Sequence, residues 1–183
     1  DSLETFFAGG ISFGLPPGRT AGQPVNDMAA FRLYSSKESA ANNMYSQFIN
    51  YVFLFDSNIS GLTPGAAVEF RGVRIGTVLD VPFNGIPMDS LASLGTPLIP
   101  VRARIEPQRL NFLDTSEAMS LQKWNELIED RINKGVRATL KIGNYLNGAK
   151  VINIDFMKNP PAVKIKEFAG YQIFPTAPDA LAN

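Results

Sequence analysis

The sequence GLTPGAAVEFRGVRIGTV, residues 61–78, decides how the rest of the chain is interpreted. Pro64 fixes φ and Gly65 can adopt a positive φ, so this pair predicts a type II turn. Apolar residues then alternate with charged ones, as in a half-buried strand. The apolar positions are Val68, Phe70, Val73 and Ile75. Gly72 and Gly76 interrupt the alternation, and such glycines mark bulges or bends. We therefore expect a curled sheet that forms a small barrel.

The flanking sequence predicts a mainly β fold. Further strand patterns, rich in apolar residues, occupy 51–55, 101–105, 136–140 and 151–156. Residues 163–175 include a short apolar segment, which predicts an exit strand. Residues 82–100 contain four prolines without a steady period, and we interpret them as an excursion loop.

One amphipathic helix interrupts the strand patterns. Its apolar residues recur at spacings of three and four, which is typical of a helix that buries one face. They are Leu121, Trp124, Leu127, Ile128 and Ile132. Ser116 or Ser120 is the candidate N-cap, and Gly135 lies just past the expected end.

The composition excludes several classes of function. The 183 residues include 17 basic and 17 acidic side chains, so the chain lacks the surplus positive charge typical of a nucleic-acid binder. There is no His and no Cys, which removes Ser-His-Asp and Cys-His sites, Cys/His zinc sites and disulfides. We predict no catalytic residue, no metal site and no cofactor. The chain starts at Asp1, and we interpret it as a fragment.

A short internal echo indicates a repeat. SLETFFAGGISF near the N-terminus and KIGNYLNGAKVINIDF near residue 150 share one pattern: an aliphatic residue, an apolar pair, a glycine and then a strand. On this interpretation, residues 1–13 end one module and residues 14–44 form a linker. A second module occupies residues 45–160, and residues 161–183 form an exit segment and the start of another linker.

The same residues carry a resemblance to a known family. GLTPGAAVEFRGVRIGTV (61–78) resembles the signature hairpin of the MCE ("mammalian cell entry") domain, and GVRATLKIGNYLNG (135–148) resembles the segment leading into its pore-lining loop. The sequences 30–40 and 2–13 are most similar to the paraquat-inducible protein B type, whose MCE domains occur in tandem. The excursion at 82–100 and the segment 110–134 lie outside the minimal motif, and the loop has Asn-Tyr-Leu-Asn where the family more often has consecutive aliphatics.

The resemblance implies an architecture and a function. MCE domains are small β-barrels that assemble as homohexameric rings, in which apolar loops surround a central pore. Such rings bind phospholipid or other acyl lipids and help to move them across the periplasm between the inner and outer membranes, without catalysis. For this chain, the resemblance implies a periplasmic location, anchorage in the inner membrane through a segment absent from the fragment, and inner-membrane partner proteins. The pore-lining residues it implies are Tyr145, Leu146 and Ile142, with Phe6 and Phe7 in the preceding repeat.

Physical chemistry explains why such a protein needs a ring. Exposing an acyl chain of about 16 carbons to water costs on the order of 12 kcal/mol, at about 0.8 kcal/mol per CH₂. The apolar pair Tyr145-Leu146 is too small to shield such a chain alone. Identical copies around an axis would place several pairs side by side and enclose a dry track.

Other interpretations remain open at this point. An apolar pair beside a turn commonly folds onto its own core. The strand arginines (Arg71, Arg74, Arg102, Arg104 and Arg137) could contact lipid headgroups, line a solvated barrel face or pair between subunits. A surface adhesin or host-cell entry factor would bind cells and carry no lipid. A carboxylate-based enzyme such as a glycosidase would need an acidic pair facing a cleft; its candidates are Asp114, Glu117, Glu126, Glu129 and Asp130.

Overall fold

The structure is a computed structural model, and it describes residues 14, 22–33, 47–95, 97–110 and 120–178. The chain divides into two compact units, residues 1–44 and 45–183. In the first unit, residues 22–33 form a turn-containing segment without helix or strand. Phe31 and Leu33 of this segment are both largely exposed. The predicted module boundaries remain predictions.

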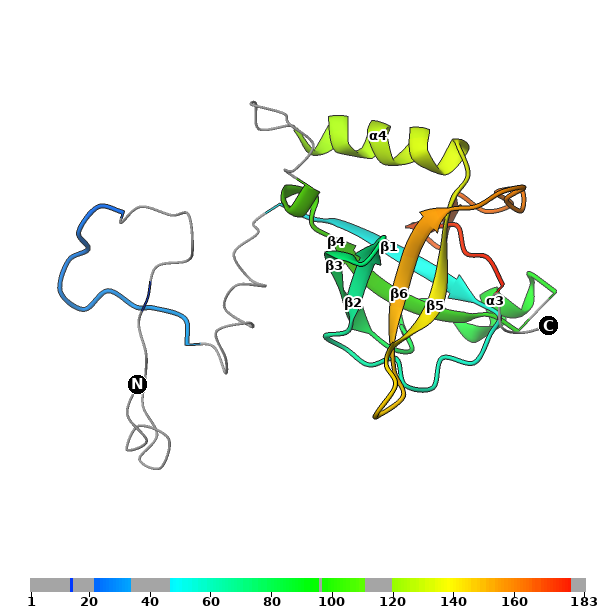
Figure 1. Cartoon of the computed structure of the whole chain (residues 1–183), viewed down its shortest axis with the longest axis horizontal. Helices are drawn as coiled ribbons and strands as arrows, with labels where there is room; N and C mark the ends of the chain where they lie inside the picture. The colour runs from blue at the N-terminus through cyan, green and yellow to red at the C-terminus, as the bar shows by residue number, and fades with distance from the viewer. Residues whose placement is uncertain (1–13, 15–21, 34–46, 96, 111–119, 179–183) are drawn as a thin grey trace. The chain divides into compact units, whose positions relative to one another are not determined.

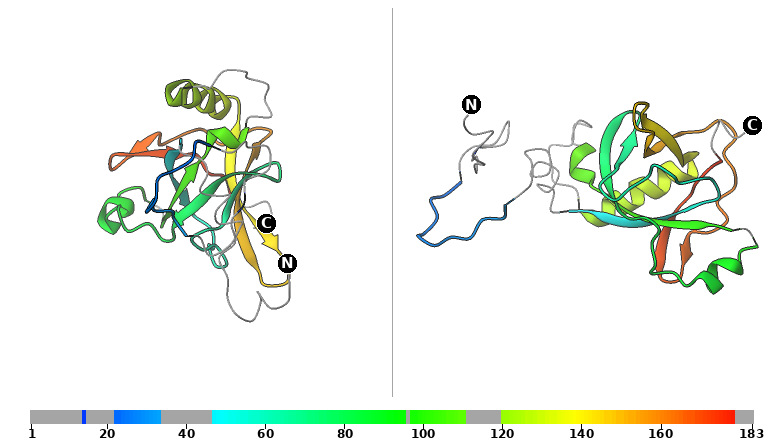
Figure 2. Two further views of the ribbon diagram at one scale, coloured as in Figure 1. Left: turned by 90° about the vertical axis from the view of Figure 1, so that its left-hand side faces the viewer. Right: turned by 90° about the horizontal axis from the view of Figure 1, so that it is seen from below.

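The second unit is built on one eight-stranded sheet in the order β5-β6-β2-β3-β4-β1-β8-β7 (Figures 1 and 2). The strands are β1 (Ile49–Phe55), β2 (Ala67–Phe70), β3 (Val73–Asp80), β4 (Ile99–Ile105), β5 (Val136–Asn144), β6 (Ala149–Phe156), β7 (Glu167–Phe168) and β8 (Tyr171–Phe174). Most neighbours are antiparallel, whereas β1 pairs with β8 and β2 pairs with β6 in parallel. The prediction of a mainly β fold is confirmed.

The sheet curls until its two sides meet. Ala138 of β5 donates its amide hydrogen to the Pro175 carbonyl, with 3.0 Å between nitrogen and oxygen. The Ala177 amide donates in turn to the Ala138 carbonyl at 2.9 Å. The segment after β8 therefore closes the sheet against β5, which gives the barrel-like curvature that the glycines of 61–78 predict. The main core cluster lies inside this curl.

The β2–β3 hairpin has a tight two-residue turn. Arg71 and Gly72 both have positive φ, 51° and 83°, as a type I′ hairpin turn requires. Gly72 therefore lies in the turn, and its predicted place within a strand is wrong. At Gly76 a Cβ atom would lie 2.2 Å from the Arg104 carbonyl oxygen of β4, so close strand packing there requires glycine. The pairing of β2 with β3 shifts register at Val68/Glu69, opposite this site.

β1 is buried on both faces. Tyr51, Phe53 and Phe55 enter the main core, whereas Val52 and Leu54 pack into a second cluster on the other face. Phe83, Ile86 and Leu91 cover this second face, and Leu91 belongs to the short helix α3 (Met88–Ala92). The prediction of an excursion loop at 82–100 is therefore wrong: a small helix forms there because apolar residues between the prolines cover the exterior of β1.

The helix α4 (Leu121–Asn133) is confirmed, and it lies across the sheet in Figure 1. Ser120 is its N-cap, and its hydroxyl accepts a hydrogen bond from the Lys123 amide at 3.3 Å. Trp124 and Ile132 are buried against the main core. A 3-10 turn, η1 (Pro107–Leu110), follows β4.

Arg137 ties the end of α4 to the sheet. This side chain is 4% exposed and its guanidinium donates to the carbonyls of Ile132, Val136 and Pro161 at 2.7–3.1 Å. Burial lowers the pKa of Arg137 from its ordinary value. Arg137 therefore belongs to neither a solvated stripe nor an exposed headgroup site.

Candidate functional site

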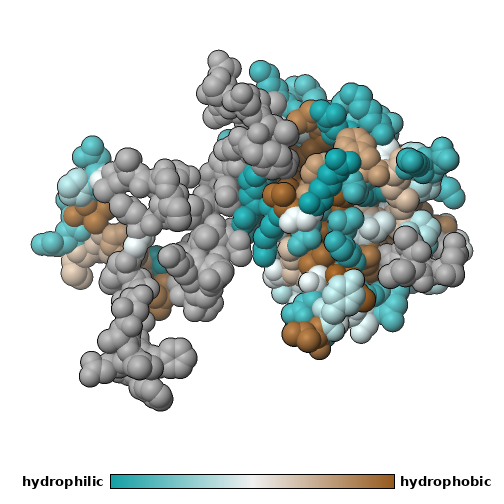
Figure 3. Space-filling model, in the orientation of Figure 1, coloured by the Kyte–Doolittle hydropathy of each residue, from teal (hydrophilic) through white to brown (hydrophobic). Residues whose placement is uncertain are grey.

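The turn between β5 and β6 presents an apolar pair to solvent. Tyr145 is 84% exposed and Leu146 is 98% exposed. The strands on either side pair with each other from Val136↔Phe156 to Asn144↔Ala149, so the pair stands at the end of a long regular hairpin. Figure 3 shows hydrophobic surface at the lower end of the second unit, where this hairpin ends. Neither side chain packs into the barrel of its own chain.

Two asparagines fix the conformation of this turn. The Asn144 side-chain oxygen accepts a hydrogen bond from the Leu146 amide at 2.9 Å, and the Asn147 side-chain oxygen accepts from the Ala149 amide at 3.0 Å. Such side-chain-to-backbone bonds replace water at amides that the ladder leaves unpaired. Gly148 has a φ of 69°, which closes the turn. Asn144 and Asn147 therefore fix the backbone of the turn on both sides of the apolar pair.

The loop at residues 58–61 braces the hairpin from the side. The Lys150 amide donates to the Gly61 carbonyl at 2.8 Å, and the Lys150 ammonium donates to the Asn58 carbonyl. Gly61 has a φ of 88°, and a Cβ atom on it would lie 2.3 Å from the Gly148 carbonyl oxygen. Gly61, the first residue of the signature sequence, therefore supports the apolar turn. Sequence patterns alone do not show this contact.

The other predicted site residues lie elsewhere. Ile142 is half-buried on β5, three residues before the exposed pair, and does not share its degree of exposure. Phe6 and Phe7 lie outside the described residues. The structure therefore brings Tyr145 and Leu146 together at one tip and gives Ile142 a place along the strand that leads to it.

Three of the five arginines predicted on strands have acidic partners within the chain, and one of them, Arg71, lies in the β2–β3 turn. Arg71 pairs with Asp155 at 2.9 Å, Arg102 with Asp80 at 2.6 Å and Arg104 with Glu106 at 2.7 Å. Burial alone would raise the pKa of Asp155. The net effect is a lowered pKa, because Asp155 accepts hydrogen bonds from Arg71 and the Phe156 amide and lies beside the positive charge of Arg71. These pairings hold the arginines in ion pairs on the sheet rather than in an uncompensated basic stripe.

Sequence reasoning missed the buried carboxylate at Glu106. This side chain is fully buried and also pairs with Arg109 of η1. Burial, together with the nearby positive charge of Arg109, lowers the pKa of Arg74, which borders the same cluster. The only sequence signal is an acid two residues after Arg104, at the end of the alternating segment. A buried charge bound by two arginines indicates a structural ion cluster.

The carboxylates considered for catalysis do not form a site. Glu126, Glu129 and Asp130 lie along the exposed or half-buried surface of α4. Asp114 and Glu117 fall outside the described residues. Across the described part of the chain, no three acidic side chains gather in a way that could hold a metal ion. Within the same residues, no helix has the length and apolar character needed to cross a membrane.

Comparison with known proteins gives a family match and structural likenesses. Residues 49–157 match the family described as "MlaD protein". A chain from the solved structure titled "Acinetobacter MlaFEDB complex in ATP-bound Vtrans1 conformation" is 18% identical, with a TM-score of 0.37 over 74% of this chain and 76% of that chain. The family match includes the signature hairpin, α4 and the β5–β6 turn, and confirms the predicted MCE-type domain. Tandem MCE repeats and the paraquat-inducible type remain predictions. Because the matched residues make up well over half of the sequence, the chain belongs to the MlaD family.

Proposed function

We propose that this chain is a lipid-binding module of a ring-shaped envelope assembly. In this assembly, Tyr145 and Leu146 from several copies, six if the ring is hexameric, converge on a common axis and shield acyl chains. Ile142 extends the lining along β5, and Phe6 and Phe7 do the same in a preceding ring. The module binds lipid passively, without catalysis, while other components supply energy and direction.

The exposed pair at the β5–β6 turn carries this proposal. A tyrosine and a leucine exposed to 84% and 98% lose the stabilisation that burial gives large side chains, about 1.5–3 kcal/mol for each. The two Asx bonds and the brace at Gly61 nevertheless hold the pair outward. Because the apolar pair is held away from its own core, it is available to contact another apolar partner.

Membership of the MlaD family supports the same proposal. By the resemblance described above, this turn corresponds to the pore-lining loop of MCE domains, and here it has the exposure that a pore loop needs. We further propose that the module belongs to a longer periplasmic protein, anchored in the inner membrane, with residues 14–44 linking it to a preceding MCE repeat. Its partners would be lipid, identical copies and inner-membrane proteins.

Site-specific photocrosslinking in cells tests this function. A photoreactive amino acid placed at Tyr145 or Leu146 of the complete protein should capture acyl lipid. The same amino acid at Lys123, an exposed position on α4, is the matched control and should capture little lipid. Mass spectrometry of the captured material identifies the lipid, and the oligomeric mass is measured in the same preparation.

Polar substitution gives the complementary result. Tyr145→Asn with Leu146→Asn should keep the ring intact and lower lipid capture at position 142 at least ten-fold. Val73→Asn, another exposed apolar position, should leave capture unchanged. A strictly monomeric parent protein, or lipid capture unaffected by the double substitution, contradicts the proposal. Cell binding without any lipid would support an adhesin instead.

A further inference from the structure

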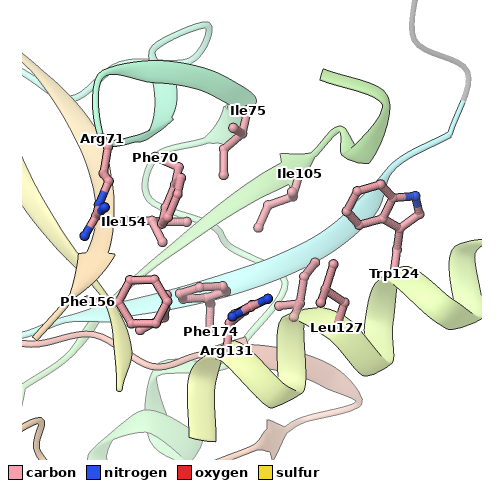
Figure 4. Close-up of a pocket in the computed structure, with 12 residues that line it drawn as sticks. Phe70, Arg71, Ile75, Ile105, Trp124, Leu127, Arg131, Ile154, Phe156 and Phe174 are labelled. Carbon is pink, nitrogen blue, oxygen red and sulfur yellow. The ribbon is translucent and has the colours of Figure 1, made fainter. Parts of the chain in front are cut away.

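A pocket of about 350 Å³ lies between α4 and the inner face of the curled sheet. Trp124, Leu127 and Ile128 line it from the helix, and Ile75, Ile105 and Ile154 are among the sheet residues that face it (Figure 4). None of its lining residues belongs to the β5–β6 turn. The pocket is formed by one copy of the chain and needs no ring.

The lining of this pocket is almost entirely apolar, whereas its rim is not. Trp124 stands at one side in Figure 4, and Phe156 stands at the other beside Arg71. Arg131, also on α4, lies between Phe156 and Leu127 in Figure 4. Arg71, Arg131 and Phe156 are exposed, so the pocket reaches the surface where the two guanidinium groups lie.

The charge at this rim is positive overall. Arg71 is 2.9 Å from Asp155 and lies over the rings of Phe70 and Phe156, at 5.8 and 5.7 Å from their centroids. Asp155 thus compensates Arg71 and fixes its position. Arg131 has no ion pair among the residues that the structure describes. Within the described part of the chain, one positive charge beside the opening therefore has no acidic partner.

We propose that this pocket binds a single acyl chain of roughly ten to twelve carbons whose anionic headgroup contacts Arg131. Apolar cavities exclude water and accept apolar ligands, and small-molecule pockets begin at about 300 Å³. A methylene is similar in size to a water molecule, which occupies about 30 Å³, so about ten to twelve such groups fill the pocket. Two complete lipid chains do not fit. The site is independent of the proposed ring.

Titration of the 183-residue protein with fatty acids of increasing length tests this site. The probes are octanoate, decanoate, laurate, myristate and palmitate, each below the concentration at which it self-associates, with binding measured by calorimetry. Affinity should rise about four-fold for each added methylene until the pocket is full. It should level off between ten and twelve carbons, because further methylenes remain in water. Absence of binding, or affinity that keeps rising through palmitate, overturns the proposal.

Substitutions at the pocket locate the bound chain. Ile128→Phe adds volume from a half-buried helix position and should weaken laurate binding at least ten-fold. Arg131→Glu alters only an exposed side chain, so the fold should persist. It should weaken laurate about five-fold while leaving 1-dodecanol binding unchanged. Lys123→Glu makes the same charge change on α4 away from the pocket and should have no effect. Equal laurate binding by wild type and both pocket variants overturns the proposal.

Variants at each site distinguish lipid binding in the pocket from lipid binding at the β5–β6 turn. Tyr145→Asn with Leu146→Asn should leave laurate binding unchanged, because those residues do not line the pocket. Ile128→Phe should leave lipid capture at Tyr145 unchanged in the assembled protein. If the turn variant abolishes laurate binding, the pocket is not the site. If capture at Tyr145 fails while laurate binding survives, the ring proposal fails alone.

Discussion

Tyr51 links the stability of the domain to alkaline pH. Its ring is 6% exposed and packs edge-on against Phe174, with ring centroids 5.4 Å apart. Burial, followed by the negative charge of Glu129, raises its pKa from 10.0 to about 12. Below pH 10 the phenol is neutral in both folded and unfolded chains. Between pH 10 and 12 only the unfolded chain releases the proton, so the free energy of unfolding falls as pH rises.

We expect the titration of Tyr51 to lower the free energy of unfolding by about 1.4 kcal/mol between pH 9 and pH 11, since one pKa unit corresponds to 1.36 kcal/mol. The Tyr51→Phe variant lacks the proton and should lose that much less stability over the same interval. Urea unfolding of both proteins at several pH values measures the difference. Tyr145→Phe, at an exposed tyrosine, controls for loss of a phenol. Parallel pH profiles for wild type and Tyr51→Phe would contradict this expectation.

Arg137 shows what a strand pattern leaves undetermined. Its alternation with Val136 and Ala138 predicts an outward side chain, yet it is buried. Its partners are carbonyl oxygens at the end of α4 and at Pro161, 24 residues further along the chain. The Pro161 carbonyl reaches Arg137 only through tertiary folding, which no local pattern encodes. Glu106 has partners close to it in the sequence, Arg104 on β4 and Arg109 on η1, but an alternating pattern does not show that its carboxylate is buried between them.

At the scale of elements, the loop at residues 58–61 and the β5–β6 hairpin depend on each other. Gly61→Ala would place a Cβ atom 2.3 Å from the Gly148 carbonyl oxygen and impose a strained φ of 88°. We expect the free energy of unfolding to fall by about 1–3 kcal/mol through backbone strain alone, and the turn to be displaced. Faster amide exchange at Lys150, which donates to Gly61, would report that displacement.

Gly65→Ala is the matched control for this prediction. Gly65 has nearly the same φ, 89°, but a Cβ atom on it would meet nothing within 4 Å. Both variants therefore share the backbone strain, and only Gly61→Ala adds the collision with the hairpin. If exchange at Lys150 is equally fast in both variants, the close approach at Gly148 does not support the turn.

Local signals predicted some elements well. The Pro-Gly turn, the alternation after it and the three- and four-residue spacing of α4 are properties of short segments, so β2, β3 and α4 were predictable. The region 82–98 was not, because Phe83, Ile86 and Leu91 share no period and are buried only against the outer face of β1. The sequence of β1 is a continuous apolar run because its two faces pack against different core clusters.

At the scale of the whole molecule, the residues after 165 complete the barrel. β8 pairs with β1, Phe174 is buried in the main core, and residues 175–177 bond to β5. Deleting residues 166–183 should therefore abolish cooperative thermal unfolding, because it exposes two strand edges and part of the core. Deleting residues 179–183 keeps every one of these contacts and is the control. Circular dichroism during heating measures both, and a cooperative transition in the shorter protein would contradict the expectation.

The candidate site was only partly predictable. The Asn-Tyr-Leu-Asn-Gly sequence indicates a turn with an apolar pair, and the structure places that pair in solvent. The brace at Gly61 and the pocket below α4 were not predictable, since each requires segments far apart in the sequence to meet at a defined distance. From the sequence, Ile75, Ile105 and Ile154 are ordinary core residues. Only the structure shows that they line a pocket beneath α4.

Residues 175–177, which close the barrel against β5, lie near the C-terminal end of the sequence, and this affects how the protein is synthesised. Ala138 can bond to Pro175 and Ala177 only after the ribosome has added nearly forty further residues. Elongation at about 5–20 residues per second leaves the edge of β5 without its partner for several seconds. An unpaired strand edge on a nascent chain is a template for foreign strands. A chaperone that covers β5 during this interval would protect the protein from joining the wrong neighbour.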